Sequence, residues 1–369
     1  MMNHSNRVAG SLVIGCLLMA CGSSSDGKNE RSARPETAAA LKNPGVSNGS
    51  TPTPAPTRSP IPGPTSTPAP TPTFSPAPSS SGSTATNGDL WVDPYSHAAN
   101  DARILMGSNA DDARRIQHIA NQPMAQWLGE WSGNVEDSVR KAAAQSGGKI
   151  LAFVLYNIPF RDCGSYSAGG TQPENYRHWV EAVARGLGSQ KAFLILEPDA
   201  VAQLDCLPAA AQSERLALLK DAVQILKKAP GAKVYVDGGH PAWKPADVMA
   251  ERLLQAGVMA ADGFALNISN FQTLETNISY GRTLRSRLGK NFVIDTSRNG
   301  RGPDPDGVWC NPRSRALGRA PTLQTGTEGV DAFLWVKRPG ESDGSCNGGP
   351  GAGQWWREIA LEMAREAGI

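Results

Sequence analysis

Residues 191–205, KAFLILEPDAVAQLD, most tightly constrain what this chain can fold into. The apolar run 192–196 lacks the alternation of a half-exposed strand, which is typical of a strand buried on both faces of a parallel sheet. Pro198 cannot donate a sheet hydrogen bond and disfavours helix at Glu197, so the strand should end there. Glu197 and Asp199 then lie where a buried strand opens into a loop, and barrel-like α/β folds carry their chemistry at that edge. Alternatively, these carboxylates solvate the strand end or cap the next helix.

The first 20 residues resemble a bacterial lipoprotein signal. Arg7 precedes an apolar run, 8–20, that is too short to span a bilayer as a mature helix. The run ends in LMAC, followed by glycine and serines, and in such signals the cysteine, here Cys21, is lipidated and becomes the new N-terminus. The alternative is an ordinary secretory signal with a chance cysteine. Both predict export, and the first adds a membrane anchor at the cell surface or facing the periplasm.

Residues 23–87 consist mainly of Pro, Thr, Ser, Gly and Ala, as in TPTPAPT. Such a segment buries too little apolar surface to offset chain entropy, which predicts a disordered linker with polyproline II character. At about 3.1 Å per residue it could reach up to on the order of 200 Å. We therefore divide the chain into a signal peptide at 1–20, a lipidated cysteine and linker at 21–87, and one catalytic domain at 88–369.

The cysteines fit an exported protein. Cys16 leaves with the signal and Cys21 carries lipid, so an even number remains in an oxidising compartment and predicts two disulfides whose pairing the spacing leaves open. The remaining cysteines are Cys163, Cys206, Cys310 and Cys346. A net charge of +2 without a basic stripe gives no sign of a nucleic-acid partner. The lack of CxxC or HExxH spacing argues against zinc.

Seven strand candidates alternate with helical patterns in the folded part. The strands are expected near residues 125–128, 150–156, 192–197, 233–237, 263–267, 292–295 and 333–337. The helices are expected near 111–120, 136–145, 173–187, 213–229, 245–256, 271–288 and 353–366. Strands joined by crossover helices form a parallel sheet. Their number favours a closed or nearly closed α/β barrel, with an open sheet as the alternative.

Polar side chains follow six of these strands. Because the carboxyl ends of parallel barrel strands share one rim, these side chains should converge on a single site. In chain order they are Arg161 and Asp162, Asp199, Asp237 and His240, Asn267, Asp295, and finally Lys337, Glu341 and Asp343.

Four blocks of sequence resemble glycoside hydrolase family 6, which contains β-1,4-glucan endoglucanases and cellobiohydrolases. The blocks are YNIPFRDCGSYSAGG (156–170), LILEPDAVAQLDC (194–206), VYVDGGHPAW (234–243) and LWVKRPGESDG (334–344). They occur in the family's order, and the resemblance runs from Trp91 to the C-terminus. It implies a distorted parallel β/α barrel of about seven strands, inverting hydrolysis, no metal or organic cofactor, and disulfides Cys163–Cys206 and Cys310–Cys346.

The resemblance also assigns catalytic roles. Inversion needs a protonated acid and a base about 6.5–9.5 Å apart. Asp199 matches the acid, which requires a raised pKa, and Asp343 matches the proposed base. Asp162 matches the aspartate that supports the acid and orients water. Arg161 is expected to hold Asp162 by an ion pair, and Ser167, beside Ala168, stands where the family often has a serine that handles water.

Further positions match the family's substrate contacts. An indole face can cover the axial hydrogens of a glucose ring. The stacking tryptophans implied are Trp91, Trp243 and Trp309. The other contacts implied are Tyr156, His240, Asn267, Lys337 and Glu341, and Asp237 is implied to hold sugar hydroxyls or the local charge balance. The alternatives are a helix cap for Asp237, a core histidine for His240 and a solvated strand-end lysine for Lys337. Trp127, Trp179 and Trp355 are interpreted as structural.

These features predict an exported, lipid-anchored, monomeric enzyme that hydrolyses β-1,4-glucosidic bonds in cellulose or related β-glucans with inversion. The segments after Asp162 and Asp343 are too short to roof a cleft, which favours endo-acting cleavage. One alternative is a cellobiohydrolase of the same family. The other is an inactive glucan-binding lipoprotein, which would not need Asp162, Asp199 and Asp343 together.

Overall fold

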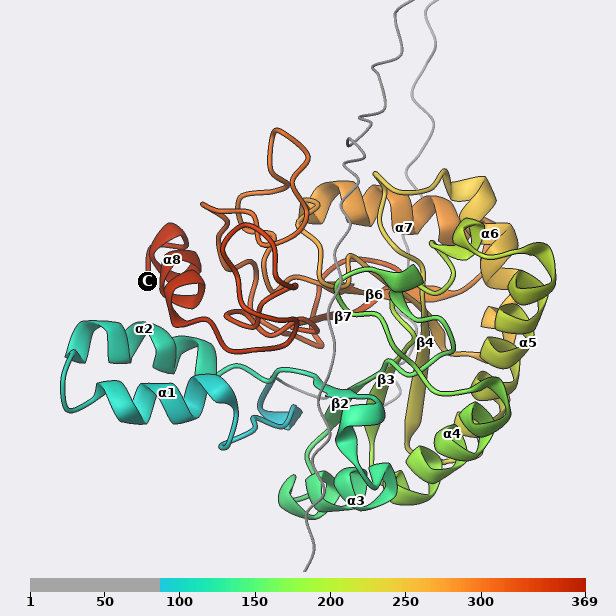
Figure 1. Ribbon diagram of the computed structural model, residues 1–369, viewed down its shortest axis with the longest axis horizontal. Coiled ribbons are helices and arrows are strands. Elements are labelled where there is room, and N and C mark those ends of the chain that lie inside the picture. Colours follow the sequence, from blue (N-terminus) through green and yellow to red (C-terminus); the bar gives the residue numbers. More distant parts are fainter. Residues whose placement is uncertain (1–86) are drawn as a thin grey trace, which may run out of the picture. The chain divides into compact units, whose positions relative to one another are not determined.

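A computed structural model describes residues 87–369 (Figure 1). The expected signal peptide, Cys16, Cys21 and the Pro-rich linker up to residue 86 lie outside the described residues. In the described part of the chain, no helix is long and apolar enough to cross a membrane.

Within residues 87–369, seven strands form one sheet in which each strand pairs in parallel with the next along the chain. They are β1 (Gln126–Leu128), β2 (Leu151–Leu155), β3 (Ala192–Leu196), β4 (Ala232–Asp237), β5 (Gly263–Leu266), β6 (Asn291–Asp295) and β7 (Val330–Leu334). Among these described strands no ladder joins β7 to β1, but Met124 forms a parallel bridge with Trp335, and the Ala125 N–H donates to the Trp335 carbonyl at 2.9 Å. The sheet is thus a nearly closed, distorted barrel, and the predicted fold class is confirmed.

The α-helices of the part of the chain that the structure describes divide into two groups (Figure 1). Five crossover helices surround the outside of the curled sheet: α3 (Val135–Gln145), α4 (Pro173–Leu187), α5 (Ala209–Leu226), α6 (Ala246–Gln255) and α7 (Leu274–Leu288). The other three lie together at one side: α1 (His97–Leu105), α2 (Ala110–Ala120) and α8 (Arg357–Glu366). They share an apolar cluster that includes Ile116, Ile119 and Trp335.

Apolar side chains fill both faces of the sheet. On one face Leu194 and Leu196 of β3 join the core cluster that includes apolar residues of α3 to α7. On the other, Ile195 lies in a second cluster with Tyr235 and Val293. This two-sided burial explains why residues 192–196 show no polar alternation.

The chain departs from the predicted elements in several places. Helix α5 covers residues 209–226 rather than 213–229, and α7 begins at residue 274 rather than 271. Helix α1 was not predicted, although Ser96 caps it by accepting from the Ala99 N–H at 3.2 Å. Strand β7 ends at Leu334 rather than 337, because the Asp295 carboxylate takes the N–H groups of Val336 and Lys337. Helix α8 begins at residue 357, not 353, since residues 353–356 pair with residues 340–342 through backbone hydrogen bonds.

Candidate active site

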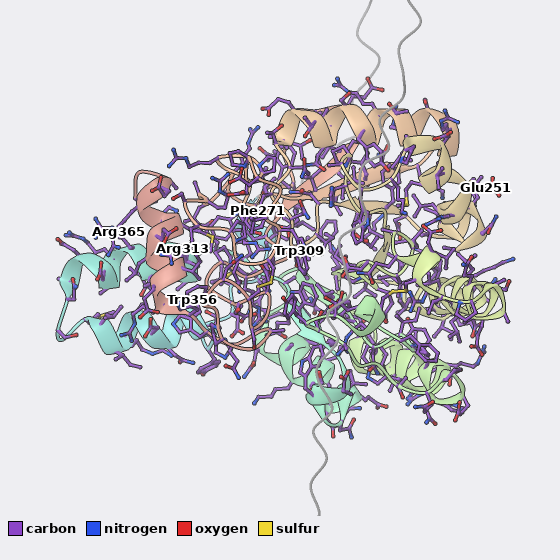
Figure 2. The ribbon with its side chains drawn as sticks, turned by 45° about the horizontal axis from the view of Figure 1, so that its top comes forward. Glu251, Phe271, Trp309, Arg313, Trp356 and Arg365 are labelled. Atoms are coloured by element: carbon purple, nitrogen blue, oxygen red, sulfur yellow. A yellow bond between two sulfur atoms is a disulfide. The ribbon has the colours of Figure 1, made fainter. Side chains whose placement is uncertain are left out.

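A cavity of about 1240 Å³ is lined by residues that follow the carboxyl ends of the strands. It brings together most of the residues expected at the site: Tyr156, Arg161, Asp162, Ser167, Asp199, His240, Trp243, Trp309, Lys337, Glu341 and Asp343. Figure 2 shows Trp309 and Phe271, another lining residue, in the central part of the molecule, and Trp356 and Arg313 away from them near α8.

The chain turns sharply at the end of β3. Glu197 and Asp199 both have positive φ, 49° and 73°, which is costly for non-glycine residues and is found mostly at functional sites. The fully buried Glu197 carboxylate supports this turn by accepting from the N–H groups of Asn157 and Ile158 at 3.0 and 3.1 Å and from the Tyr176 hydroxyl at 2.9 Å. The Glu197 carboxylate thus ties the end of β3 to the loop after β2.

Asp199 lies in surroundings that favour its protonated form. Burial and the charge of Asp162 raise its pKa to about 7, although the Tyr156 hydroxyl donates to Asp199 Oδ2 at 3.0 Å. Beneath it, the Asp237 carboxylate accepts from the Asp199 N–H at 3.0 Å, and burial raises the pKa of Asp237 to about 8. A carboxyl group that keeps its proton near neutral pH can act as a general acid.

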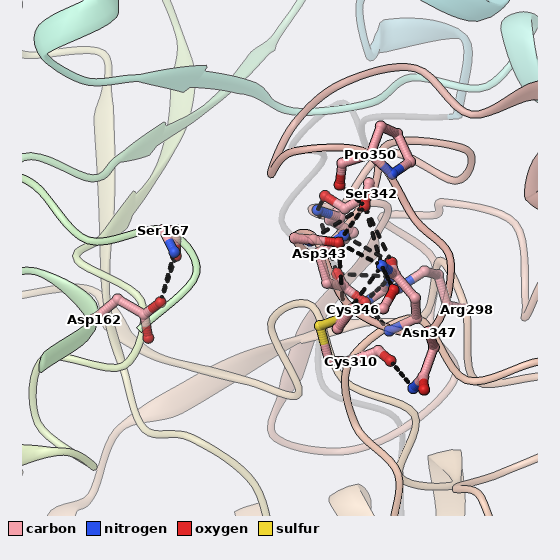
Figure 3. The surroundings of a disulfide bond; sticks show 12 residues. Asp162, Ser167, Arg298, Cys310, Ser342, Asp343, Cys346, Asn347 and Pro350 are labelled. Carbon is pink, nitrogen blue, oxygen red and sulfur yellow. Dashed lines mark hydrogen bonds and ion pairs between the residues drawn. A yellow bond between two sulfur atoms is a disulfide. The ribbon is translucent and has the colours of Figure 1, made fainter. Parts of the chain in front are cut away.

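Asp162 is connected to Asp199 through two hydroxyl groups. Asp162 Oδ2 accepts from Ser167 Oγ at 2.8 Å and from the Ser167 N–H at 2.9 Å (Figure 3). Asp162 Oδ1 accepts from Gln203 Nε2 at 3.1 Å. Ser167 Oγ is 3.1 Å from the Tyr156 hydroxyl, which contacts Asp199. Ser167 therefore hydrogen-bonds within the same network, as a water-handling residue would need to.

Asp343 has the opposite electrostatic environment. Arg298 Nη1 donates to both carboxylate oxygens at 2.9 and 3.0 Å, the Asn311 N–H donates at 3.0 Å, and Lys337 Nζ lies 3.4 Å away (Figure 3). Burial by itself would raise the pKa of Asp343, but the charges of Arg298 and Lys337 lower it below its usual value. An ionised carboxylate of this kind can accept a proton or stabilise positive charge.

The expected ion pair between Arg161 and Asp162 is not formed. Instead, Arg161 binds both carboxylate oxygens of Glu130 at 2.6 and 2.9 Å and donates to the carbonyls of Tyr156 and Ser167 at 2.7 and 2.8 Å. Asp162 has φ 54°, so the backbone turns between the two residues. Arg161 thus shapes the backbone of this loop rather than the Asp162 carboxylate.

Three residues expected to contact substrate lie away from the cavity wall. Trp91 is buried in the core cluster with β2 and β3. The fully buried Asn267 side chain donates to the Asp295 carbonyl at 2.9 Å, and Asp237 is buried beneath Asp199. Their side chains pack or hydrogen-bond within the scaffold, and the expectation that they contact sugar stays a prediction.

Two tryptophans interpreted as structural do line the cavity, Trp127 and Trp355. The Trp127 ring meets Tyr156 edge-on with centroids 5.2 Å apart, and Trp127 Nε1 donates to the Val336 carbonyl at 2.9 Å. Trp179, by contrast, packs against the core and stacks on Tyr176, as expected of a structural residue.

Sequence analysis missed several residues of the site, among them His97, Trp131, Gln203 and Arg298. Of these, Arg298 had a usable signal, since it lies three residues after the predicted strand that ends at Asp295. His97 lines the cavity from the unpredicted helix α1, and His97 Nδ1 lies 3.0 Å from Glu341 Oε1.

His240 and Lys337 are two further polar residues on the cavity wall. His240 lies beside Trp243 with ring centroids 5.3 Å apart, and burial lowers the pKa of His240 to about 4, so it is neutral at physiological pH. Its buried Nδ1 has no hydrogen-bond partner within the described residues. Lys337 Nζ donates to the Ser342 carbonyl at 3.0 Å.

Disulfides hold the loops that carry these residues. Cys163–Cys206 joins the loop after β2 to the segment after β3, and Cys310–Cys346 joins the Trp309 loop to the Asp343 loop (Figure 3). These are the two pairings that the resemblance implied. Among residues 87–369, no three or more His, Cys, Asp or Glu side chains cluster in a way that could hold a metal ion.

Comparison with known proteins places the chain in a family. The family model described as glycosyl hydrolases family 6 matches residues 85–367. The chain is 47% identical over 286 residues to endoglucanase A of Cellulomonas fimi, a match covering 75% of this chain and 61% of that protein. It is 42% identical over 294 residues to endoglucanase 1 of Streptomyces halstedii, covering 76% and 89%.

A solved structure agrees. The endoglucanase Cel6 from Mycobacterium tuberculosis, in complex with a methyl-cellobiosyl-thio-cellobioside, is 45% identical with a TM-score of 0.72. The match covers 76% of this chain and 97% of that one. With the fold, the matched range and these relatives taken together, the chain belongs to glycosyl hydrolase family 6.

Proposed function

We propose that this protein is an endo-acting glycoside hydrolase that cleaves β-1,4-glucosidic bonds in cellulose or related β-glucans with inversion of the anomeric carbon. The proposal rests on Asp199 and Asp343, two aspartates that line the same cavity. The pKa of Asp199 is raised to about 7 by burial, and that of Asp343 is lowered by Arg298 and Lys337 against the effect of burial. The names of the endoglucanase relatives support the substrate class.

The two carboxyl groups divide the chemistry. Asp199 donates its proton to the glycosidic oxygen as the bond to the anomeric carbon breaks. Water attacks the opposite face of the sugar, and ionised Asp343 takes up the proton that the water loses. Asp162 keeps negative charge near Asp199 and, through Ser167 and Tyr156, holds the network beside it. Because each carboxyl acts once and no covalent sugar intermediate forms, the product has the inverted configuration.

The cavity wall supplies sugar contacts. Trp127, Trp243 and Trp309 present ring surfaces to the cavity, suited to the apolar faces of glucose. Lys337, Glu341 and His97 supply polar groups for hydroxyls.

Short loops support endo-acting cleavage. Helix α4 begins at Pro173, ten residues beyond Cys163, and the Asp343 loop passes through a glycine-rich segment, 344–353. Loops of this length do not build the long roof that a tunnel needs.

Two measurements on the wild type and one variant test the proposal. Purified enzyme acting on carboxymethyl cellulose should lower viscosity early relative to the reducing ends released, and proton NMR should show the α-anomer first. Asp199→Asn should reduce the rate by about 10²–10⁴-fold, the usual contribution of general acid catalysis. Early β-anomer would refute inversion, and mostly cellobiose from crystalline cellulose with little viscosity loss would favour a cellobiohydrolase.

We further propose that the protein is exported and tethered. This rests on the LMAC motif at 18–21, the Pro-rich segment up to residue 87, and two disulfides in the folded domain. The folded domain at 88–369 would then act at the end of the linker as a monomer. A Cys21→Ala variant should move from the membrane fraction to the soluble fraction, and a wild type already soluble, with an N-terminus other than Cys21, would contradict the anchor.

A further inference from the structure

Trp131 lines the same cavity but has no role in the site described above. It lies in the short 3-10 helix η2 (Glu130–Ser132) after β1, and 55% of its surface is exposed. An indole exposed to this extent contributes little to a core, so its place in the cavity wall calls for another explanation.

The Trp131 ring is held in a fixed orientation. The Arg161 guanidinium carbon lies 4.9 Å from its centroid. Arg161 is only 4% exposed, and its N–H groups are bound to Glu130 and to the carbonyls of Tyr156, Ser167 and Ala168. A Cβ on Gly129 would lie 2.5 Å from Trp131 ring atoms, so the indole packs directly against the Gly129 backbone.

The same guanidinium connects Trp131 with the reacting centre. The Arg161 guanidinium carbon is also 4.8 Å from the Tyr156 ring centroid, and the Tyr156 hydroxyl donates to Asp199. Trp131 is therefore fixed relative to the residues that would act on the sugar. A preordered aromatic surface binds a ligand with little further loss of side-chain entropy.

We propose that Trp131 is a stacking platform for a glucosyl unit of the bound β-glucan chain, a subsite additional to those formed by Trp127, Trp243 and Trp309. The inference rests on the proposed function. The exposed indole suits the apolar face of a pyranose. Beside it, the Glu130 side chain is 45% exposed, and its carboxylate, bound to Arg161, can accept hydrogen bonds from sugar hydroxyls.

The test measures binding without hydrolysis. In an Asp199→Asn background, calorimetry with cello-oligosaccharides from cellotriose to cellohexaose reports affinity as the chain lengthens. Trp131→Ala should weaken binding roughly 3- to 10-fold, the range expected for loss of one aromatic stacking contact. That loss should appear only for oligosaccharides long enough to reach the platform. Trp131→Phe should keep part of the affinity, whereas Trp131→Leu, which covers Arg161 without a ring, should behave like Ala.

Trp356→Ala is the matched control. Trp356 also pairs with an arginine, Arg313, at 5.8 Å, but it lies outside this cavity, so its loss should leave oligosaccharide affinity unchanged. Equal affinity of Trp131→Ala and its parent for every oligosaccharide would overturn the platform. An equal loss at every length, cellotriose included, would also overturn it, because it would show that the ring only supports Arg161. Failure of the parent itself to bind any of these sugars would instead refute the proposed function as well.

Discussion

Asp199 and Asp343 are the same residue type in one cavity, and their neighbours give them different acidities. Burial and the negative charge of Asp162 act together on Asp199 and raise its pKa. Asp343 is also buried, but the positive charges of Arg298 and Lys337 outweigh that burial. Divergent pKa values of this kind allow two carboxyl groups to serve as acid and base at the same pH.

The dependence of kcat/KM on pH should reflect this difference. The active form needs protonated Asp199 and ionised Asp343, so kcat/KM should fall as pH rises through about 7. On the acid side kcat/KM should fall only below the usual range of aspartate pKa values, because the pKa of Asp343 is lowered.

The Tyr156 hydrogen bond lowers the pKa of Asp199 against the effect of burial, so Tyr156→Phe should move the alkaline limb of the kcat/KM profile to higher pH. An alkaline limb that stays in place in Tyr156→Phe would contradict the assignment.

Asp199 should also make folding depend on pH. Its pKa is about 7 in the folded chain and about 3.9 when unfolded, so between these values only the folded chain holds the proton. Stability from this group is complete below the unfolded pKa and is lost as pH rises towards the folded one. An asparagine side chain at this position has no carboxyl proton to lose, so the Tm of Asp199→Asn should rise relative to wild type from acid to neutral pH. A Tm difference that is constant with pH would refute this.

The sequence around each strand end predicted which polar residues line the cavity better than it predicted which residues they bind. Asp162 and Asp199 were expected at strand ends, and they line the cavity. Arg161 was paired with its neighbour in sequence, but its carboxylate partner, Glu130, is 31 residues away. Trp127, interpreted as structural, lines the cavity, and Trp91, expected to stack on sugar, is buried in the core. The residue type alone does not reveal which side of the sheet a tryptophan faces.

The strands were predictable because both of their faces are buried. Apolar runs without alternation marked β2 to β6 to within about a residue, a narrower error than is usual for boundaries. The end of β7 was misplaced because the apolar run continues through Val336, whereas the ladder stops when Asp295 binds the next N–H groups. The end of β7 is therefore determined by a contact with Asp295 at the end of β6, and no local sequence pattern predicts that contact.

Helix α5 supports the loops that carry Asp162 and Asp199 through one buried side chain. Arg215 is 2% exposed and donates to the carbonyls of Pro159 and Phe160 at 3.0 and 2.8 Å, with the Ala200 carbonyl at 3.5 Å. The first two carbonyls precede Asp162 and the third follows Asp199.

Replacing this guanidinium should therefore affect stability and activity together. Arg215→Met keeps an apolar stem but leaves buried carbonyls unpaired, which should cost about 1–3 kcal/mol of unfolding free energy and lower kcat. The matched control is Arg177→Met, since Arg177 forms exposed ion pairs with Glu181 and Asp221 and should matter little. Urea unfolding and kcat on soluble β-glucan measure both effects, and an Arg215→Met variant no different from the control would exclude a supporting role.

In the barrel as a whole, loops distant in sequence meet around the cavity. The loops after β2 and β7 carry Asp162 and Asp343, and they touch through Tyr166. A Cβ on Gly344 would lie 2.4 Å from Tyr166 Cβ, so the tyrosine packs directly on Gly344. Its ring centroid is also 6.0 Å from that of Trp309. The sequence could not predict this contact, because it depends on how the barrel closes.

The mode of cleavage should depend on Tyr166. It is 50% exposed, and a contact made by one such side chain can open to admit the middle of a glucan chain. The two short loops build no long roof, but while this single contact between them is closed, it would hold that chain for repeated cuts. Tyr166→Ala removes the contact, so each encounter should yield fewer cuts, and viscosity of carboxymethyl cellulose should fall further per reducing end released. Tyr95→Ala, which removes an exposed tyrosine outside the cavity, should not change this ratio. A ratio in Tyr166→Ala equal to wild type would mean that the loops themselves, rather than this contact, determine how the chain is held.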